Sequence, residues 1–340
     1  MQMPSCRRTI AAIALLGACA TAPAATTCVS NVSQLAPALL AAQSNGEDDV
    51  IYLVVGNYLL TSELQYFAAA DETHKLSIIG GLAPGCASGY ASSGSSVLDG
   101  QNMTRILTIS AQGEVDIGRI TFAHGNATQY FGGALNLSNG SADGMYVFAN
   151  VFIANQVTPG AGGAMYVSSS TQGDIFVWSN LFLANTGSGA GAIYAYGGHN
   201  TYITGNTILA NSLVNHAGLG ALDLAGPGHY WLSNNILWNN EGSDVYDQVG
   251  HADYAHNDIG VKGGFAPLSE SGDLNVDPGF VGFLSVTPGP ASPLVNAGLD
   301  TAPGGVGGCC DPSGDVRVQG KHVDIGAYET DVLFRDVFGN

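Results

Sequence analysis

The stretch between Arg119 and Asn240 repeats one short pattern four times. In each copy a few apolar residues lie between two asparagines, and the closing asparagines follow at intervals of 30, 26 and 28 residues. The four segments are Asn150–Asn155, Asn180–Asn185, Asn206–Asn211 and Asn234–Asn239. A glycine recurs in the same phase, at Gly133, Gly163, Gly191 and Gly220. A period of this length indicates stacked supersecondary units, each of which buries its apolar face against the next.

The repeated units have the composition of short β-strands. Runs rich in aromatic and β-branched residues, such as Ile175–Trp178 and Tyr230–Leu232, are separated by Gly, Asn, Ser and Thr. A coil of about 28 residues with three short strands and no helix predicts a parallel β-helix, whose coils lie roughly 4.8 Å apart. We therefore predict an all-β chain with a single elongated domain.

The repeated asparagines have a structural role in such a stack. Equivalent residues of successive coils lie above one another, so their amides can hydrogen-bond along the column. Asparagine also tolerates the left-handed backbone of a sharp corner, and the glycines predict a second corner with positive φ. The predicted ladder comprises Asn155, Asn185, Asn211 and Asn239. The residues predicted to stack inside are Phe152, Phe182, Ile208 and Ile236.

Two phrases of the repeat carry a family resemblance. Gly-Gly-Ala-Leu/Met and Phe-x-x-Asn are similar to the repeats of chlamydial polymorphic outer-membrane proteins. The segment from about Asp48 to Asp247 resembles the right-handed parallel β-helix of the pectin-lyase-like superfamily. The resemblance implies a right-handed solenoid, but lyases, hydrolases, adhesins and passenger domains share this scaffold, so it implies no single function.

After Asp247 the repeat gives way to four other phrases. They are Asn275–Phe280, Ser292–Gly298, Asp311-x-x-Gly-x-x-Arg317-x-x-Gly320 and Val323–Glu329. Their order resembles the C-terminal end of bacterial choice-of-anchor Q β-helix proteins. The predicted organisation is a signal peptide (1–25), an N-terminal cap with the first coils (26–100), central repeats (101–265), choice-of-anchor-Q-like coils (266–329) and a tail (330–340).

The first 25 residues have the features of an export signal. Arg7 and Arg8 precede the apolar run Ile10–Leu16, and Ala22-Pro-Ala24 offers a signal-peptidase site. Leu16-Gly-Ala-Cys19 also resembles a lipobox, in which Cys19 would carry a lipid anchor. No later segment has the length and apolarity of a transmembrane helix. We therefore predict a bacterial protein that is secreted or held on the outer surface of the envelope.

Composition restricts the partners of the exported chain. Removal of Arg7 and Arg8 leaves seven basic residues against 27 acidic ones. This balance argues against nucleic acid, whose binding needs a basic surface. It argues less strongly against acidic glycans, because a bound calcium ion can bridge two anions. No cofactor is required.

The N-terminal region predicts a cap. Val32–Ala42 has the pattern of a short amphipathic helix, with Ser33 as N-cap and Leu35, Leu39 and Leu40 on one face. Such a helix would cover the open strand edges at the end of the stack. Four cysteines follow the signal segment: Cys28, Cys86, Cys309 and Cys310. In an exported chain we expect a Cys28–Cys86 disulfide that fastens the cap to the early coils.

The sequence offers little for catalysis. No Lys or Arg occurs from Ile120 to Val261, so the central coils lack the base that lyases of this fold typically use. A glycoside hydrolase needs two carboxyl groups across one bond. The candidates are Asp223, Asp244 and Asp247, which the repeat does not bring into one column. His199, His216 and His229 are interpreted as surface loop residues.

Asp311 and Asp315 are the candidate ligands for calcium. Both lie in the short segment Asp311-Pro-Ser-Gly-Asp315 and carry the oxygen ligands that calcium prefers. The segment is shorter than a full calcium loop. A turn stabilised by aspartate side chains is the alternative interpretation.

Alternation along the strand after each glycine predicts a binding face. If Leu135, Met165, Ile193 and Leu222 point inward, then Asn136, Tyr166, Tyr194 and Asp223 form an outward column, with Tyr196 beside it. A second set comprises Tyr146, Phe176, Tyr202 and Tyr230, with Phe148 and Trp178. A register slip of one residue would place this second set in the core. The predicted ligand-binding residues are Tyr166, Tyr194, Tyr196, Trp178 and Asp223.

These observations favour a protein that binds rather than reacts. We expect an adhesin-like surface protein that contacts a polysaccharide, a cell-surface glycan or a surface protein along one strand face. The alternative is a polysaccharide lyase or glycoside hydrolase, which only the fold resemblance suggests.

Overall fold

The computed structural model describes residues 25–330, apart from 88, 92, 215–218, 282–284, 307–309 and 319. Almost all of the proposed signal segment, including Cys19, lies outside these residues, as do His216, Cys309 and the tail from 331 onward. In the described part of the chain, no helix is long and apolar enough to cross a membrane.

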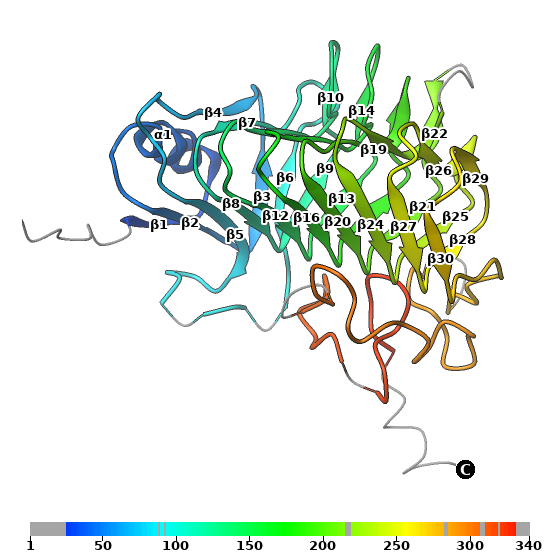
Figure 1. The fold of residues 1–340 in the computed structure, drawn as a ribbon. Coiled ribbons are helices and arrows are strands. Elements are labelled where there is room, and N and C mark those ends of the chain that lie inside the picture. The colour runs from blue at the N-terminus through cyan, green and yellow to red at the C-terminus, as the bar shows by residue number, and fades with distance from the viewer. Residues whose placement is uncertain are drawn as a thin grey trace, which may run out of the picture.

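The described chain is mostly β, with one helix and strands that pair in parallel (Figure 1). Each circuit of the chain adds one strand to each of three sheets, A, B and C, so strands that are neighbours in space are distant in sequence. Sheet A comprises, in spatial order, β1 (Ala25–Val29), β2 (Asp49–Val54), β5 (Leu76–Leu82), β8 (Val115–Gly118), β12 (Met145–Phe148), β16 (Ile175–Trp178), β20 (Asn200–Thr204), β24 (His229–Ser233), β27 (Ala252–Ala255) and β30 (Ser269–Ser271). This arrangement is consistent with a stack of parallel β-coils.

Sheets B and C have eight strands each, and a short sheet D lies between them in each central circuit. Sheet B comprises β3 (Gly56–Leu59), β6 (Ser96–Asp99), β9 (Ile120–Ala123), β13 (Val151–Ile153), β17 (Leu181–Leu183), β21 (Thr207–Leu209), β25 (Ile236–Trp238) and β28 (Asp258–Ile259). Sheet C comprises β4 (Leu64–Phe67), β7 (Leu107–Ala111), β11 (Leu135–Asn139), β15 (Met165–Ser169), β19 (Ala190–Tyr196), β23 (Gly220–Ala225), β26 (Ser243–Asp247) and β29 (Lys262–Gly264). Sheet D comprises β10 (Asn126–Ala127), β14 (Gln156–Val157), β18 (Thr186–Gly187) and β22 (Ser212–Leu213).

The core is built from columns of identical or similar side chains. The rings of Phe122, Phe152 and Phe182 stack at centroid distances of 4.8 and 4.7 Å, and Ile208 continues the column. The next member is Leu237, since β21 pairs Ile208 with Leu237. The prediction that Ile236 joins this column is therefore wrong by one residue.

The same shift changes the asparagine ladder. Asn185 Oδ1 accepts hydrogen bonds from the backbone N and the Nδ2 of Asn155, both at 3.0 Å. Asn211 repeats this role one coil later, and its own acceptor is Asn240, not the predicted Asn239. Asparagine pairs at 234–235 and 239–240 keep the same spacing in either register, so the sequence pattern does not distinguish the two.

A second ladder lies at the corner between sheets A and B. It comprises Asn150, Asn180, Asn206, Asn235 and Asn257. Aspartate replaces asparagine at the end of each ladder: Asn257 donates to Asp273 and Asn240 donates to Asp244. Both ladders run through buried positions, so each amide satisfies backbone groups that water cannot reach.

Of the residues predicted to be left-handed, Asn239 has positive φ, at 54°, but the other asparagines of the predicted ladder and the repeated glycines do not. The residue before each rung has positive φ, for example 52° at Ala149 and 53° at Ser179. Positive φ also occurs at Gly132 and Gly162, at 69° and 74°, one residue before two of the repeated glycines. The repeated glycines are needed for space instead, because a Cβ at Gly133 would lie 2.1 Å from a backbone oxygen of the next coil.

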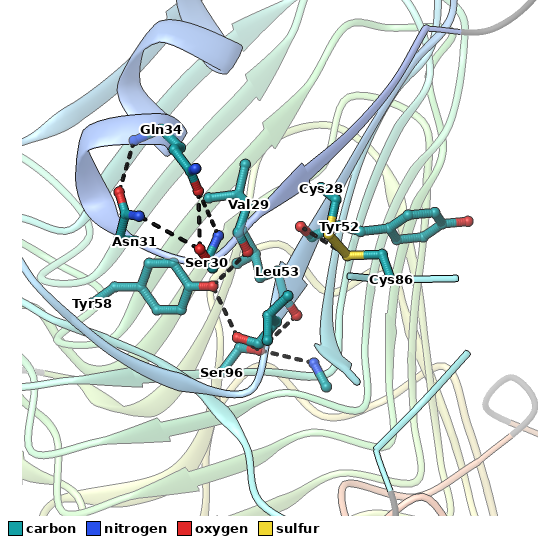
Figure 2. The surroundings of a disulfide bond; sticks show 12 residues. Cys28, Val29, Ser30, Asn31, Gln34, Tyr52, Leu53, Tyr58, Cys86 and Ser96 are labelled. Atoms are coloured by element: carbon teal, nitrogen blue, oxygen red, sulfur yellow. Dashed lines mark hydrogen bonds between the residues drawn. A yellow bond between two sulfur atoms is a disulfide. The ribbon is translucent and has the colours of Figure 1, made fainter. Parts of the chain in front are cut away.

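The predicted N-terminal helix and the predicted disulfide are confirmed. Helix α1 (Val32–Ala42) has the predicted bounds, and a disulfide joins Cys28 to Cys86 (Figure 2). The N-cap is Asn31 rather than Ser33, since the side chain of Asn31 accepts from Gln34 N at 3.2 Å. Leu35, Leu39 and Ala42 face the core, while Leu40 is 68% exposed.

The coils end earlier than predicted. The last strand is β30, and the described residues from 272 to 330 contain no further strand of the three sheets. This C-terminal segment runs back along one side of the stack (Figure 1). Its Gly326 and Ala327 donate to Asn234 O and Thr207 Oγ1. The prediction of further coils over 266–329 is therefore wrong after Ser271. Leu294 and Ile325 of this segment instead pack against Ile236 of β25.

Candidate functional site

The predicted strip lies on the outer face of sheet C, where alternate residues of each strand point away from the core. Tyr166 on β15 pairs with Tyr194 on β19, which pairs with Asp223 on β23, which pairs with Tyr246 on β26. Tyr196 lies two residues further along β19. The register therefore brings Tyr166, Tyr194, Tyr196 and Asp223 onto adjacent rungs of one face.

Asp223 is fully buried although it belongs to the outward column. Its exposed fraction is 0%, and neither carboxyl oxygen has a hydrogen-bond partner among the described residues. Burial raises the pKa of Asp223 to about 8, so the carboxyl is largely protonated at neutral pH. A buried polar group without a partner costs about 1–3 kcal/mol, and such a group in a native structure requires an explanation.

Polar side chains near Asp223 form part of a pocket wall. The Tyr194 hydroxyl hydrogen-bonds to the side chain of Gln248, and burial, followed by the nearby charge of Asp223, raises the pKa of Tyr194. Tyr246, the ladder neighbour of Asp223, and Gln248 both line a pocket of about 440 Å³. The other residues that line this pocket are Leu219, Asp247, Gly264 and Phe265.

The tyrosines of the strip differ in how their rings are used. Phe131, from the loop before β11, stacks on Tyr166 at 4.4 Å, and Tyr166 stacks on Tyr194 at 5.8 Å. Tyr196 is 42% exposed and makes no ring contact with another aromatic residue of the described chain. Its neighbours across the ladder are the small residues Ser168 and Ala225. Tyr196 therefore offers an aromatic ring to the solvent.

Trp178 lies on a different face from the tyrosines of sheet C. It belongs to β16 in sheet A, where Tyr146, Phe176 and Tyr202 form an outward ladder. The centroids of these rings are 4.6 and 4.9 Å apart, with interplanar angles of 2° and 11°. Trp178 packs against Phe176 at 5.0 Å with a tilt of 60°. The structure thus separates Trp178 from the other predicted ligand-binding residues.

The last member of the sheet A set was misplaced by one residue. β20 pairs Tyr202 with Trp231, while Tyr230 pairs with Thr201 and lies in the core. The buried hydroxyl of Tyr230 is satisfied, since it accepts from Gly197 N at 2.6 Å and lies 3.0 Å from Ala195 O. Tyr230 is therefore a core residue, and Trp231 completes the outward ladder.

Two histidine–aspartate pairs border the sheet A ladder, which the sequence analysis missed. His199 Nδ1 lies 2.6 Å from Asp174 Oδ1, and His229 Nε2 lies 2.7 Å from Asp253 Oδ2. Each pair joins residues of neighbouring coils about one period apart. That separation is the only sequence signal that could have found them.

The three candidate catalytic carboxylates do not converge. Asp244 ends an asparagine ladder and accepts from Asn240 and from Val261 N. Asp247 pairs with the inward Leu224, and its Oδ1 accepts from the backbone N of Val249 and Gly250. Since Asp223 points outward on the same sheet, Asp223 and Asp247 cannot flank one glycosidic bond.

The candidate calcium ligands form a turn. Asp311 Oδ1 accepts from Ser313 N at 2.8 Å and from Asp315 N at 3.0 Å. Asp311 is buried and Asp315 is exposed. Within the described ranges, no group of three or more His, Cys, Asp or Glu residues is arranged to hold a metal ion.

Comparison with known proteins identifies no relative. No family model, no curated protein and no solved structure matches this chain.

Proposed function

We propose that the chain is an exported, right-handed, pectin-lyase-like β-helix that binds a glycan along the outer face of sheet C. Right-handedness rests on the general preference of parallel crossover connections and on the family resemblance of the repeat. The Cys28–Cys86 disulfide supports an oxidising location outside the cytoplasm. Residues 1–25 supply the export signal in this proposal, with Cys19 as an alternative lipid anchor.

The unpartnered carboxyl of Asp223 carries the proposal for sheet C. A sugar presents several hydroxyl groups that both donate and accept hydrogen bonds, and Asp223 has two oxygens without a partner. Movement of the Gln248 side chain would open a path from the adjacent pocket to this carboxyl. The hydrogen bonds formed there would offset the cost of keeping Asp223 buried.

The remainder of the face suits an extended chain of sugars. The exposed ring of Tyr196 provides an apolar surface for stacking, and Ser138 and Ser168 lie on the rungs before it. Four strand steps, from β11 to β26, span roughly 19 Å at the usual inter-strand distance. A rigid aromatic and hydroxyl surface of this kind binds with little loss of conformational entropy.

Retention on insoluble polysaccharides tests the proposal. Purified mature protein would be incubated with cellulose, chitin, peptidoglycan and pectate, with and without calcium, and the bound fraction measured. We expect retention on at least one of them, with loss in Tyr196→Ala and a marked decrease in Asp223→Asn. Trp178→Ala on sheet A is the control and should retain binding.

Two outcomes would contradict the proposal. Retention that survives both sheet C substitutions would place the ligand elsewhere. Release of reducing ends or of unsaturated uronates during the incubation would favour the alternative, a polysaccharide hydrolase or lyase. Thermal unfolding of each variant shows whether the loss of binding has a structural cause.

A further inference from the structure

Arg119 is an unusual residue for its place in the fold. It lies at the corner between β8 and β9 with φ at 60°, a conformation that costs a non-glycine residue about 1–2 kcal/mol. The equivalent positions of the next coils hold the smaller residues Ala149, Ser179 and Gly205. Asn234 and His256 occupy this corner in the later coils. At Arg119 a long cationic side chain is kept at a strained, left-handed corner, and such strain is often associated with function.

The guanidinium group of Arg119 is only partly satisfied. Nη1 donates to Cys310 Sγ at 3.1 Å, and the carbon of the guanidinium lies 4.0 Å from the centroid of the Tyr90 ring. Nε is buried and has no hydrogen-bond partner in the described part of the chain. Within that part Arg119 also forms no ion pair with a carboxylate, although acidic residues outnumber basic ones by 27 to nine.

Arg317, which is buried, shows the contrast. Arg317 lies in the C-terminal segment, and its Nη1 is 3.3 Å from Glu329 Oε1. Burial raises the pKa of Glu329 to about 7, although the charge of Arg317 opposes this shift. Arg317 therefore has a carboxylate partner within the protein, whereas the contacts of Arg119 are with the sulfur of Cys310 and the ring of Tyr90.

A small cavity lies beside Arg119. Its volume is about 100 Å³, and four segments distant in sequence contribute to its wall. Hydroxyl groups come from Ser93 and Ser95 of the N-terminal loop, from Thr121 of β9 and from Ser313 of the C-terminal turn. Among the described residues, no carboxylate lines it. The nearest acidic side chain in sequence is Asp311, whose Oδ1 is already held by two backbone N–H groups of the turn.

We propose that this cavity binds a small oxyanion: a sulfate, a phosphate or a carboxylate. A guanidinium group forms paired, charge-assisted hydrogen bonds with such anions, and seryl hydroxyls donate to the remaining oxygens. A water molecule occupies about 30 Å³ of liquid, so the cavity has room for one polyatomic ion and not for a sugar ring. The bound anion would join the N-terminal loop, the corner and the C-terminal segment.

The anion has two sources with the same chemistry. It is either a free inorganic ion or a sulfate, phosphate or carboxylate substituent of a larger ligand. The site lies at the junction of sheets A and B and not on sheet C, so it does not depend on the proposed glycan-binding face. Failure of one proposal therefore leaves the other intact.

Calorimetric titration with inorganic sulfate tests the site. The purified mature protein, in a buffer free of phosphate and at constant ionic strength, would be titrated with sulfate, with phosphate and with glucuronate. We expect saturable binding of at least one of them at millimolar concentration or below. Arg119→Gln should abolish the binding, and Arg119→Lys should weaken it about tenfold because a lysine has no planar fork.

Ser313→Ala provides a milder variant in case the arginine substitutions prevent folding. It removes one hydroxyl from the exposed turn and should weaken the binding several-fold without loss of the folded state. Retention of the wild-type affinity in both Arg119→Gln and Ser313→Ala, or no saturable binding of any of the three anions, would overturn the proposal. A general stabilisation by sulfate that does not saturate and that is equal in wild type and variants counts against it too.

The two sources are separated by a second titration with sulfated and uronic oligosaccharides. Tighter binding of an oligosaccharide than of the inorganic ion, again lost in Arg119→Gln, identifies the anion as a substituent of a glycan. Binding of the inorganic ion alone identifies a free ion that holds the three segments together. Both results support the site, since each depends on Arg119.

Discussion

The outer faces of sheets A and C carry ladders of aromatic residues at the same height in the stack, yet the two ladders differ. On sheet A the rings of Tyr146, Phe176 and Tyr202 stack almost in parallel, and Gly304 of the C-terminal segment lies against the Tyr202 ring. On sheet C the ladder is interrupted by Asp223, a buried carboxyl without a partner. Sheet A therefore stacks its rings on one another, although Trp178 Nε1 there also lacks a hydrogen-bond partner, whereas the ladder of sheet C contains a carboxyl group without one.

This difference separates structural aromatic residues from ligand-binding ones. Rings that stack on one another turn their faces inward along the axis of the stack and leave mainly their edges for a ligand. The polar side chains beside the sheet A ladder are also paired, since His229 Nε2 lies 2.7 Å from Asp253 Oδ2. The exposed ring of Tyr196 and the unpartnered Asp223 lack such internal partners, which is why we assign the ligand to sheet C.

Asp223→Asn should produce the largest change, in the pH dependence of stability. Because burial raises the pKa of Asp223 to about 8, the folded state holds a proton that the unfolded chain releases near pH 4. The stabilisation of the folded state by this proton is complete below about pH 4 and is lost as the pH rises to about 8. Between pH 5 and 7 this titration should lower the free energy of unfolding of the wild-type protein by about 2–3 kcal/mol. The Asp223→Asn variant should not show this decrease.

Urea unfolding of both proteins at pH 5, 6 and 7 measures this difference. Burial also raises the pKa of Asp258 to about 6 and of Glu329 to about 7, but both groups remain in the variant and cancel in the comparison. Equal slopes of stability against pH in the two proteins would show that Asp223 ionises normally.

Phe176→Ala should break the sheet A ladder without affecting the ligand. The substitution removes a ring that stacks on two neighbours and should lower the free energy of unfolding by about 2–3 kcal/mol. Denaturant unfolding gives this value, and retention on the polysaccharide should be unchanged at a temperature where the variant is folded. Lost retention in a folded variant would contradict the assignment of the ligand to sheet C.

Asn240→Ala should lower the stability more than Asn239→Ala, because of these two residues Asn240 is the rung of the asparagine ladder. Its removal leaves the backbone N and Nδ2 of Asn211 without their acceptor, at a cost of about 1–3 kcal/mol. Asn239 is exposed, and the equivalent positions of earlier coils hold alanine, so its substitution should cost well under 1 kcal/mol. If thermal unfolding shows a larger loss of stability in Asn239→Ala than in Asn240→Ala, Asn239 is the rung of the ladder, as the sequence pattern first suggested.

Tyr196→Ala should have the smallest effect on stability. The ring is exposed and has no aromatic neighbour among the described residues. We therefore expect chemical unfolding to show a decrease in the free energy of unfolding of less than about 1 kcal/mol. The same variant should lose the ligand. A large loss of stability would instead show that Tyr196 is a packing residue like Phe176.

The sequence predicted the repeated architecture better than the chemistry. The phase of the repeat was sufficient to align Tyr166, Tyr194 and Asp223, because one glycine per coil fixes where each strand of sheet C begins. The helix and the Cys28–Cys86 bond followed from local patterns. The Asn-Asn pairs at 234–235 and 239–240 left the register of one coil open, and only the neighbouring coil resolves it.

The state of individual side chains depended on contacts that the repeat does not encode. The ladder neighbour of Asp223 is Tyr246, and Gln248 is bonded to the adjacent Tyr194. Both lie more than 20 residues after Asp223, so these surroundings were not predictable from its own strand. The C-terminal segment folds back on sheet B through Leu294 and Ile325, although its motifs suggested further coils. The pairing of Arg317 with Glu329 and the isolation of Arg119 follow from that fold-back.

Titration of the Asp223 carboxyl by NMR tests the central claim most directly. The carboxyl carbon of Asp223, assigned by comparison with Asp223→Asn, would be followed from pH 4 to 10 in the free protein and with the retained glycan. We predict a midpoint near pH 8 in the free protein, and a clear shift of that midpoint when the glycan is bound. A midpoint near 4 in the free protein, or one that the glycan leaves unchanged, would contradict a ligand site at Asp223.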